Sequence, residues 1–240
     1  MIIWAVVPVK ALATAKGRLA PLFTPSERRA LAAALLADVL AALRDAPRVE
    51  RVLVVSPDPE VLALAASLGA TPLADPPIPP DANTCPPAEE SGLNAALDYA
   101  ASVAAAGGAG ALLALPADLP LVTAADVAAV CEPIPPAPSV VLAPTADGGT
   151  SALLREPPLA LPARFGANSL RAHLEAAAAH GVAARLVWRR NLSLDIDRPT
   201  DLDHLAALSR PTQTQALLAR WQAAGRWPVA AALALGHAPR

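Results

Sequence analysis

Asp118 places a single carboxylate directly after an apolar run of the chain. Residues 110–115 are apolar enough for a strand buried on both faces of a parallel sheet, and Pro116 and Pro120 end strand pairing beyond it. Ligands of open α/β sheets bind outside the carboxyl ends of the strands, where Asp118 would lie. Asp118 could instead cap the following helix, but Thr123 already opens a capping pattern there. A functional role for Asp118 is therefore favoured.

Asp195 and Asp197 form a second acidic group, after the last strand, predicted over residues 185–190. Side chains two positions apart in an extended segment face the same side, so these carboxylates converge. Converging carboxylates raise each other's pKa unless a cation lies between them. Mg²⁺ is the common solution, held by one or two carboxylates together with water and substrate phosphates. Asp197 could instead only cap a helix that begins near Pro199, but we favour the metal interpretation.

Three cationic residues follow the first predicted strand, residues 2–7: they are Lys10, Lys16 and Arg18. This arrangement suits a polyphosphate, because Lys acts as a point charge and Arg as a bidentate fork. A solvated loop explains the same charges equally well, and the sequence has no Walker-type glycine loop here. The spacing alone leaves both interpretations open.

Two further segments contain features that are typical of anion-binding turns. Gly148 and Gly149 could let backbone N–H groups approach an anion. Ser169 begins a helix predicted over 170–179, whose first amides could hold a phosphate or a carboxylate. An ordinary glycine turn and an ordinary helix cap are equally good explanations of each segment taken alone.

Strands and helices alternate along the chain, which predicts a parallel sheet with right-handed crossovers. The strands are expected over 2–7, 52–56, 71–74, 110–115, 139–143, 151–154 (of uncertain direction) and 185–190, and the helices over 24–43, 59–68, 91–106, 124–131 and 170–179. A proline-rich segment, 76–90, interrupts the alternation as a lid or a disordered loop. Two more helical pieces, 211–224 and 229–235, could pack on the body through Trp221 and Trp227 or across a homodimer.

Composition excludes several classes of protein. A net charge of −2 and only 3% aromatic residues give no footprint for nucleic acid. Without an apolar run long enough to span a membrane and without a leader, the chain is expected in the cytoplasm, with Cys85 and Cys131 as free thiols. The histidines show no metal-ligand spacing, and we expect surface or helix-end positions for all four: His173, His180, His204 and His237.

The order of these motifs is more specific than any one of them. The motifs are Pro8-Val9-Lys10 with Lys16-Gly17-Arg18-Leu19, Gly92-Leu93-Asn94, Pro116-Ala117-Asp118-Leu119-Pro120, Asp147-Gly148-Gly149-Thr150, Arg164-Phe165-Gly166 with Ser169, and Leu194-Asp195-Ile196-Asp197. In this order the chain resembles the phospholactate/phosphoenolpyruvate guanylyltransferases of deazaflavin coenzyme F420 biosynthesis. The resemblance covers about residues 2–208.

The resemblance implies an α/β, Rossmann-like nucleotidyltransferase fold (GT-A/MobA-like), a three-layer sandwich with a mostly parallel central sheet. Residues 1–208 would form the nucleotidyltransferase domain and 209–240 a C-terminal helical extension. The implied reaction transfers GMP from GTP to a small phospho-acid, phosphoenolpyruvate, 2-phospho-L-lactate or 3-phospho-D-glycerate, and releases pyrophosphate. The sequence does not rank these acceptors. The segment 76–90 is longer than the family pattern, which leaves lid behaviour and base selectivity open.

The resemblance also assigns roles to residues. The Mg²⁺ ligands would be Asp118, Asp195 and Asp197. The acceptor would be held by Thr150, Gly166 and Ser169, beside Gly148 and Gly149. The triphosphate would face Lys10, Lys16 and Arg18, with Asn94 near the nucleotide, and Asp118, Lys10 and Lys16 would be catalytic.

Two alternatives remain at this stage. One is another nucleotidyltransferase of the same fold that acts on a sugar phosphate or a molybdopterin cofactor. Such proteins usually have a glycine-rich loop after the first strand, whereas residues 8–19 contain only one glycine, Gly17. The other is a non-catalytic nucleotide-binding module. Loss of one aspartate would have favoured it, and all three are present.

Overall fold

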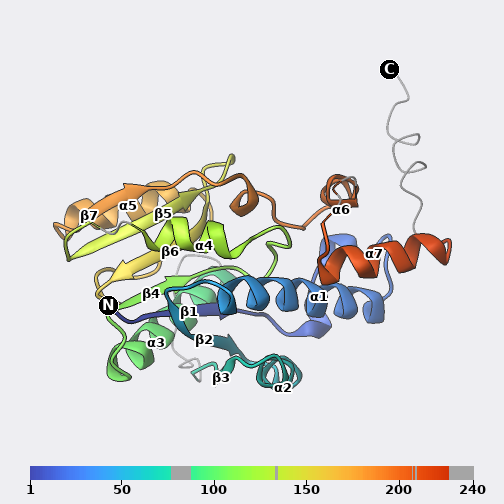
Figure 1. The fold of residues 1–240 in the computed structure, drawn as a ribbon, viewed down its shortest axis with the longest axis horizontal. Helices are drawn as coiled ribbons and strands as arrows, with labels where there is room; N and C mark the ends of the chain where they lie inside the picture. The colour runs from blue at the N-terminus through green and yellow to red at the C-terminus, as the bar shows by residue number, and fades with distance from the viewer. Residues whose placement is uncertain (77–87, 133–134, 207, 209, 227–240) are drawn as a thin grey trace.

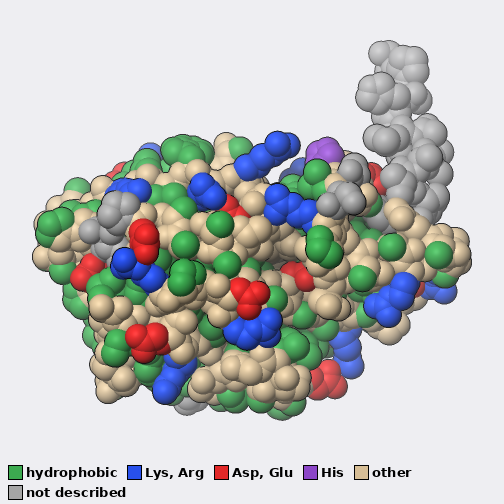
Figure 2. Space-filling view, in the orientation of Figure 1, with side chains coloured by type: hydrophobic (Ala, Val, Ile, Leu, Met, Phe, Trp, Pro, Cys, Tyr) green, Lys and Arg blue, Asp and Glu red, His purple; other side chains and the backbone are tan. Residues whose placement is uncertain are grey.

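The computed structural model describes residues 1–76, 88–132, 135–206, 208 and 210–226. The predicted segment 76–90 falls mostly outside this range, as do Cys85, Trp227 and the predicted helix 229–235. Among the described residues, no helix combines the length and the apolar character that crossing a membrane would require. On the face shown in Figure 2, basic and acidic side chains are interspersed with each other and with apolar ones.

A single seven-stranded sheet forms the centre of the molecule, with the strand order β3-β2-β1-β4-β6-β5-β7. Neighbouring strands run parallel except that β6 is antiparallel to both β4 and β5. The expected mostly parallel sheet is confirmed, and the strand of uncertain direction is the antiparallel one. The strands are β1 (Ile3–Pro8), β2 (Val49–Ser56), β3 (Thr71–Ala74), β4 (Ala111–Ala114), β5 (Ser139–Pro144), β6 (Thr150–Glu156) and β7 (Ala183–Leu186).

Helices cover both faces of the sheet, which gives the expected three layers (Figure 1). The α-helices are α1 (Pro25–Arg44), α2 (Pro59–Ser67), α3 (Ala88–Ala106), α4 (Ala124–Cys131), α5 (Ser169–Ala179), α6 (Pro199–Ala206) and α7 (Gln213–Ala223). Short 3₁₀ turns are η1 (Leu12–Thr14), η2 (Gly17–Leu19) and η3 (Arg190–Leu192).

The two cores follow from the alternation of side chains along the strands. In β1, Ala5 and Val7 face a core shared with α1, α2 and α4, whereas Trp4 and Val6 face a second core shared with α3 and α5. The chain adds β2 and β3 on one side of β1 and then crosses to place β4 on the other. This reversal opens a crevice at the carboxyl ends of β1 and β4, the usual ligand position of such sheets.

Several element boundaries differ from the prediction, and the largest difference is at the end of the last strand. Helix α3 begins at Ala88 rather than Ser91, and β2 begins at Val49 rather than Val52. The last strand was predicted over 185–190, but β7 spans Ala183–Leu186. The next pair in its register with β5 would be Ala143 with Val187, and the hydrogen bond that completes this pair would need the N–H that Pro144 lacks.

Helix α7, which begins after residue 208, packs alongside α1 (Figure 1). The buried carboxylate of Asp38 on α1 accepts hydrogen bonds from the backbone N–H groups of Gln213 (2.6 Å) and Thr214 (2.9 Å). The ring of Trp221 lies 4.9 Å from that of Phe23, centroid to centroid. Trp221 therefore packs on the body of the same chain. The description of 209–240 as an extension separate from 1–208 stays a prediction.

Candidate active site

The three aspartates singled out in the sequence meet at the crevice. Asp118 lies in the loop after β4, and Asp195 and Asp197 lie between η3 and α6. One carboxylate oxygen of each lies within 4.8 Å of those of the other two. The two segments are joined directly, because the N–H of Ile196 donates to the carbonyl of Asp118 (3.2 Å). Residues 77 positions apart in sequence thus form one acidic cluster.

Lys16 lies inside this cluster. Its Nζ donates to Asp118 Oδ2 at 2.9 Å and to Asp197 Oδ1 at 3.3 Å, and its side chain is only 10% exposed. Burial alone would lower the pKa of Lys16, but the attraction of the two carboxylates outweighs it and raises the pKa, so the side chain stays charged. Lys16 also has a left-handed backbone, with φ of +53°. Such strain at a non-glycine residue concentrates at functional sites.

Arg18 extends the cationic side of the cluster, since its Nη1 lies 3.1 Å from Asp197 Oδ2. Lys10 is exposed two residues beyond β1. The structure thus joins Lys16 and Arg18 to the carboxylates, and the contact of all three predicted cations with a triphosphate stays a prediction.

The acidic cluster fits a hard divalent cation. Its ligand atoms are carboxylate oxygens, which Mg²⁺ prefers. The pKa of Asp195 is raised by burial and then by the negative charges of Asp118 and Asp197, as expected for carboxylates that share too few cations. A bound cation would relieve this repulsion.

Asp197 does not act as a helix cap. The carboxylate that caps α6 is that of Asp201, whose Oδ2 accepts the N–H groups of Asp197 (3.0 Å) and Arg198 (2.6 Å). The Asp197 side chain is therefore left to face Lys16 and Arg18, and the capping alternative raised from the sequence does not hold.

A buried network, which the sequence did not reveal, holds the segment that carries Asp195 and Asp197. The Asp126 carboxylate is 2% exposed and accepts hydrogen bonds from Arg189 Nε (2.9 Å) and Asn191 Nδ2 (2.8 Å), besides Thr123. Burial alone would raise the pKa of Asp126, but these hydrogen bonds lower it. Asp126 therefore stays ionised and ties the start of η3 to the start of α4.

The second half of the site surrounds the start of α5. The N–H of Leu170 donates to the carbonyl of Gly148 (3.2 Å), and the N–H of Ser169 donates to that of Gly166 (3.2 Å). A Cβ on Gly149 would lie 2.6 Å from Thr145 Oγ1, so the turn has no room for one. The structure thus brings together the residues predicted to hold the acceptor.

The backbone N–H groups of this region are used differently from the expectation. Those of Gly148 and Gly149 donate to the Thr145 carbonyl and to Asp147 Oδ1, both at 3.2 Å. With those of Ser169 and Leu170, four amides expected to face an anion donate within the protein. The hydroxyls of Thr150 and Ser169 are two side-chain donors in these segments, and both residues are buried.

Asn94 holds the loop beside this region. Its Nδ2 donates to the carbonyl of Phe165 (2.9 Å), and its Oδ1 accepts the N–H of Phe165 (2.8 Å). This pair positions Gly166, the next residue. The predicted contact of Asn94 with the nucleotide stays a prediction.

His173 lies behind Thr150 and is fully buried. The surface or helix-end position expected for it is therefore wrong: the residue lies in α5, facing the sheet. Its Nδ1 is 3.1 Å from Thr150 Oγ1, and its Nε2 accepts the N–H of Arg164 at 2.9 Å. In the sequence, the i, i+4 spacing from Ser169 was the one sign that His173 faces the site, because it puts both residues on the same face of the helix.

The two halves lie at the same edge of the sheet. Because β6 is antiparallel to β4, its first residue, Thr150, lies beside the carboxyl ends of the parallel strands. A small apolar cavity of about 40 Å³ lies at this edge and is lined by Pro8 of β1, Pro116 near Asp118, and Phe165 beside Gly166. The acidic cluster and the Thr150 hydroxyl therefore lie at the same edge of the sheet.

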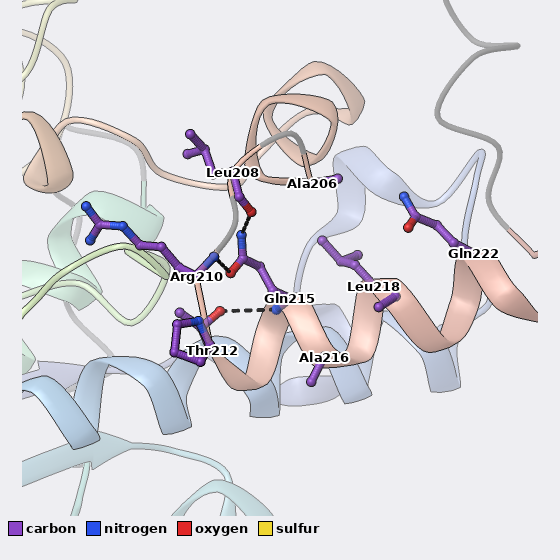
Figure 3. A pocket seen from close by; sticks show the side chains of 10 residues that line it. Ala206, Leu208, Arg210, Thr212, Gln215, Ala216, Leu218 and Gln222 are labelled. Carbon is purple, nitrogen blue, oxygen red and sulfur yellow. Dashed lines mark hydrogen bonds between the residues drawn. The ribbon is translucent and has the colours of Figure 1, made fainter.

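A larger cavity of about 340 Å³ lies between α6 and α7 (Figure 3). Gln215 crosses it and donates to the carbonyls of Leu205 and Leu208. Its described lining contains one charged side chain, Arg210, and none of the residues predicted for the site. This cavity therefore offers no comparable set of catalytic groups.

The fold and the acidic crevice define the class of nucleotidyltransferases. Two solved structures have the same fold. One is described as a nucleotide-diphospho-sugar transferase, from Desulfovibrio desulfuricans (TM-score 0.71, 17% identity, covering 93% of this chain and 96% of that one). The other is a nucleotidyl transferase from Methanothermobacter thermautotrophicus (TM-score 0.57, 17% identity, 91% and 99% covered).

The chain belongs to the CofC-like guanylyl transferase family, whose model matches residues 3–223, α7 included. It is 47% identical over 208 residues to a phosphoenolpyruvate guanylyltransferase of Rubrobacter xylanophilus (86% of this chain, 95% of the relative). It is 36% identical to a 2-phospho-L-lactate guanylyltransferase of Methanothermobacter thermautotrophicus (84% and 82%). It is 34% identical to a 3-phospho-D-glycerate guanylyltransferase of Phenylobacterium zucineum (91% and 98%). The chain is thus an enzyme of the guanylyltransferase type.

Proposed function

We propose that this enzyme transfers the GMP group of GTP to the phosphate of a small phospho-acid and releases pyrophosphate, as a step of deazaflavin coenzyme F420 biosynthesis. The observation that carries the proposal is the pairing, at one edge of the sheet, of the Asp118, Asp195 and Asp197 cluster with the hydroxyls of Thr150 and Ser169. One half suits a nucleoside triphosphate with its cation, and the other suits a small anion.

The chemistry requires little of the protein beyond positioning and charge. An oxygen of the acceptor's phosphate attacks the α-phosphorus of GTP, and the bond from that phosphorus to the oxygen bridging to the β-phosphate breaks. Pyrophosphate leaves with that bonding pair. The attacking oxygen is already an anion, so no strong protein base is required, and the work is to bring two anions together.

Named residues would supply that positioning. Asp118, Asp195 and Asp197 would hold Mg²⁺, which when bound neutralises and orients phosphate oxygens. Lys16 and Arg18, together with Lys10, would offset the negative charge of the triphosphate. Thr150, Gly166 and Ser169 would hold the acceptor, with Gly148 and Gly149 shaping the turn beside them.

Phosphoenolpyruvate is the first acceptor to test, because the 47% identical relative is named for it. The reaction as proposed takes place in the cytoplasm and involves no nucleic acid or membrane. A homodimer stays a prediction.

Pyrophosphate release by the purified chain tests this proposal. GTP, Mg²⁺ and each of phosphoenolpyruvate, 2-phospho-L-lactate and 3-phospho-D-glycerate are supplied in parallel. We expect release with one acceptor, none without an acceptor, and none with EDTA. Release with CTP or with a sugar phosphate, and with none of the three phospho-acids, would contradict it.

A further inference from the structure

His173 is a buried residue at the acceptor half of the site that the proposed chemistry does not use. It lies one turn after Ser169 on α5 and touches the two other segments of that half. Its Nε2 is 2.9 Å from the N–H nitrogen of Arg164, which precedes Phe165 and Gly166, and its Nδ1 is 3.1 Å from the hydroxyl of Thr150 at the start of β6.

These contacts define which ring nitrogen carries the proton. A backbone N–H can only donate, so Nε2 must accept, and the single proton of the neutral ring is on Nδ1. The ring also donates to the backbone of Ser169, so the one Nδ1–H is shared between that backbone and Thr150 Oγ1. Nδ1–H then donates to Thr150 Oγ1, and the hydroxyl proton of Thr150 must point elsewhere.

The ring stays neutral, so this arrangement persists at ordinary pH. Burial, followed by the positive charge of Arg155 and, more weakly, of Arg164, lowers the pKa of His173 to about 4. Arg155 is itself fully buried, and the edge of the Phe165 ring packs on the histidine with centroids 5.1 Å apart.

We propose that His173 is a positioning residue that holds the Thr150 hydroxyl as a hydrogen-bond donor toward the anionic group of the acceptor. The inference rests on the proposed function. An anion only accepts hydrogen bonds, so a hydroxyl whose lone pair is already engaged by Nδ1–H is oriented in advance to donate to it. The nearby amides of Gly148, Gly149, Ser169 and Leu170 already donate within the protein, which makes this hydroxyl more important.

Two substitutions separate orientation from packing. His173→Asn keeps an N–H near the position of Nδ1, whereas His173→Leu fills space without a donor. We expect His173→Leu to raise KM for the acceptor about ten- to hundredfold, the effect of one hydrogen bond to a charged group, with KM for GTP within about twofold. His173→Asn should recover most of this loss. His180→Asn, at the exposed end of the same helix, is the matched control and should change neither KM.

Thr150→Val tests whether the effect passes through the hydroxyl. In that background His173→Leu should add less than about twofold to KM for the acceptor, because there is no hydroxyl left to orient. Equal losses for His173→Asn and His173→Leu, a matching rise in KM for GTP, or additive losses with Thr150→Val would each overturn the inference and assign His173 to packing alone.

The tautomer can be measured without substrate. Long-range ¹H–¹⁵N correlation of ¹⁵N-histidine-labelled protein should show the proton of His173 on Nδ1, with the signal assigned by its loss in His173→Asn. A proton on Nε2 in an active enzyme overturns the inference and leaves the proposed function standing. A wild-type chain that turns over none of the phospho-acids overturns the proposed function itself, and the acceptor role of Thr150 with it.

Discussion

Asp118 is the residue on which the proposed chemistry depends most. It is partly exposed at the crevice, and its contacts are with Lys16 and, through the backbone, with Ile196. Its position was predictable because an apolar strand followed by Pro-Ala-Asp-Leu-Pro is a local pattern. The contact of Asp126 with Arg189 was not predictable in this way, because the two residues lie 63 positions apart. For His173, the i, i+4 spacing from Ser169 was a local signal, but it did not identify Thr150 as a partner.

Asp118→Asn should abolish turnover while leaving the fold intact. The change keeps the shape of the side chain but removes one anionic ligand and one partner of Lys16. Loss of the outer partners of metal ligands alone typically costs 10–100-fold, so we expect kcat to fall by at least about a hundredfold. The readouts are steady-state kinetics and the thermal midpoint. Asp45→Asn, an exposed carboxylate next to Arg44, is the matched control, and undiminished kcat in Asp118→Asn would refute the metal assignment.

His173 makes the stability of the fold sensitive to mild acid. Its pKa is about 4 in the folded chain and ordinarily 6.5, so below pH 6.5 the unfolded chain takes up a proton that the folded chain does not. The stabilisation of the folded chain that depends on a neutral His173 is therefore fully present above pH 6.5 and is lost as the pH falls toward 4. At 1.36 kcal/mol per pKa unit, about 2 kcal/mol should disappear between pH 7 and pH 5.

Urea unfolding of wild type and His173→Asn at pH 7 and pH 5 measures this contribution. Asn does not titrate, so the variant should lose about 2 kcal/mol less than wild type over this range, whatever the other groups contribute. The acidic groups with lowered pKa values, such as Asp126 and Asp147, titrate below this window. Equal losses of unfolding free energy in the two proteins would show that His173 is already protonated in the folded chain at pH 5.

At the scale of elements, the alternation of strands and helices was predictable, and most boundaries were accurate to within a few residues. The capping boxes at Thr24 and Thr123 mark the starts of α1 and α4 as expected, because a cap is a local signal. The direction of β6 was not predictable, since the residue pattern of Thr150–Glu156 is the same whether its neighbours run parallel or antiparallel. The end of β7 was misplaced because it depends on Pro144 in another strand.

Helix α7 should depend on one buried carboxylate for its attachment. Asp38 accepts the N–H groups of the first two residues of α7, where the positive end of the helix dipole also favours an anion. Asp38→Ala should therefore destabilise the chain by about 2–3 kcal/mol, the range for hydrogen bonds to a charged group. Urea unfolding measures the loss, and hydrogen exchange should show faster exchange over 213–223 than in wild type. A loss below about 0.5 kcal/mol would mean that the apolar contacts of Leu217, Leu218 and Trp221 suffice.

At the scale of the whole molecule, the antiparallel β6 decides which residues meet at the carboxyl edge of the sheet. It brings Thr150 to the edge where β4 delivers Asp118. Glycine spacing and charge counts did not reveal this convergence, because it depends on strand direction. The order of the motifs along the chain nevertheless indicated the correct family. Family membership explains why motifs that were ambiguous one at a time were informative together.

The central claim is that this crevice joins a guanylyl group to the phosphate of a phospho-acid. Phosphorus NMR of the complete reaction tests it most directly. With GTP, Mg²⁺ and phosphoenolpyruvate, the wild-type chain should produce coupled resonances of a new diphosphate that links guanosine to the acceptor, together with pyrophosphate, and Asp118→Asn should produce neither. Inorganic phosphate and GDP in place of the new diphosphate, or an equal yield from Asp118→Asn, would contradict the account.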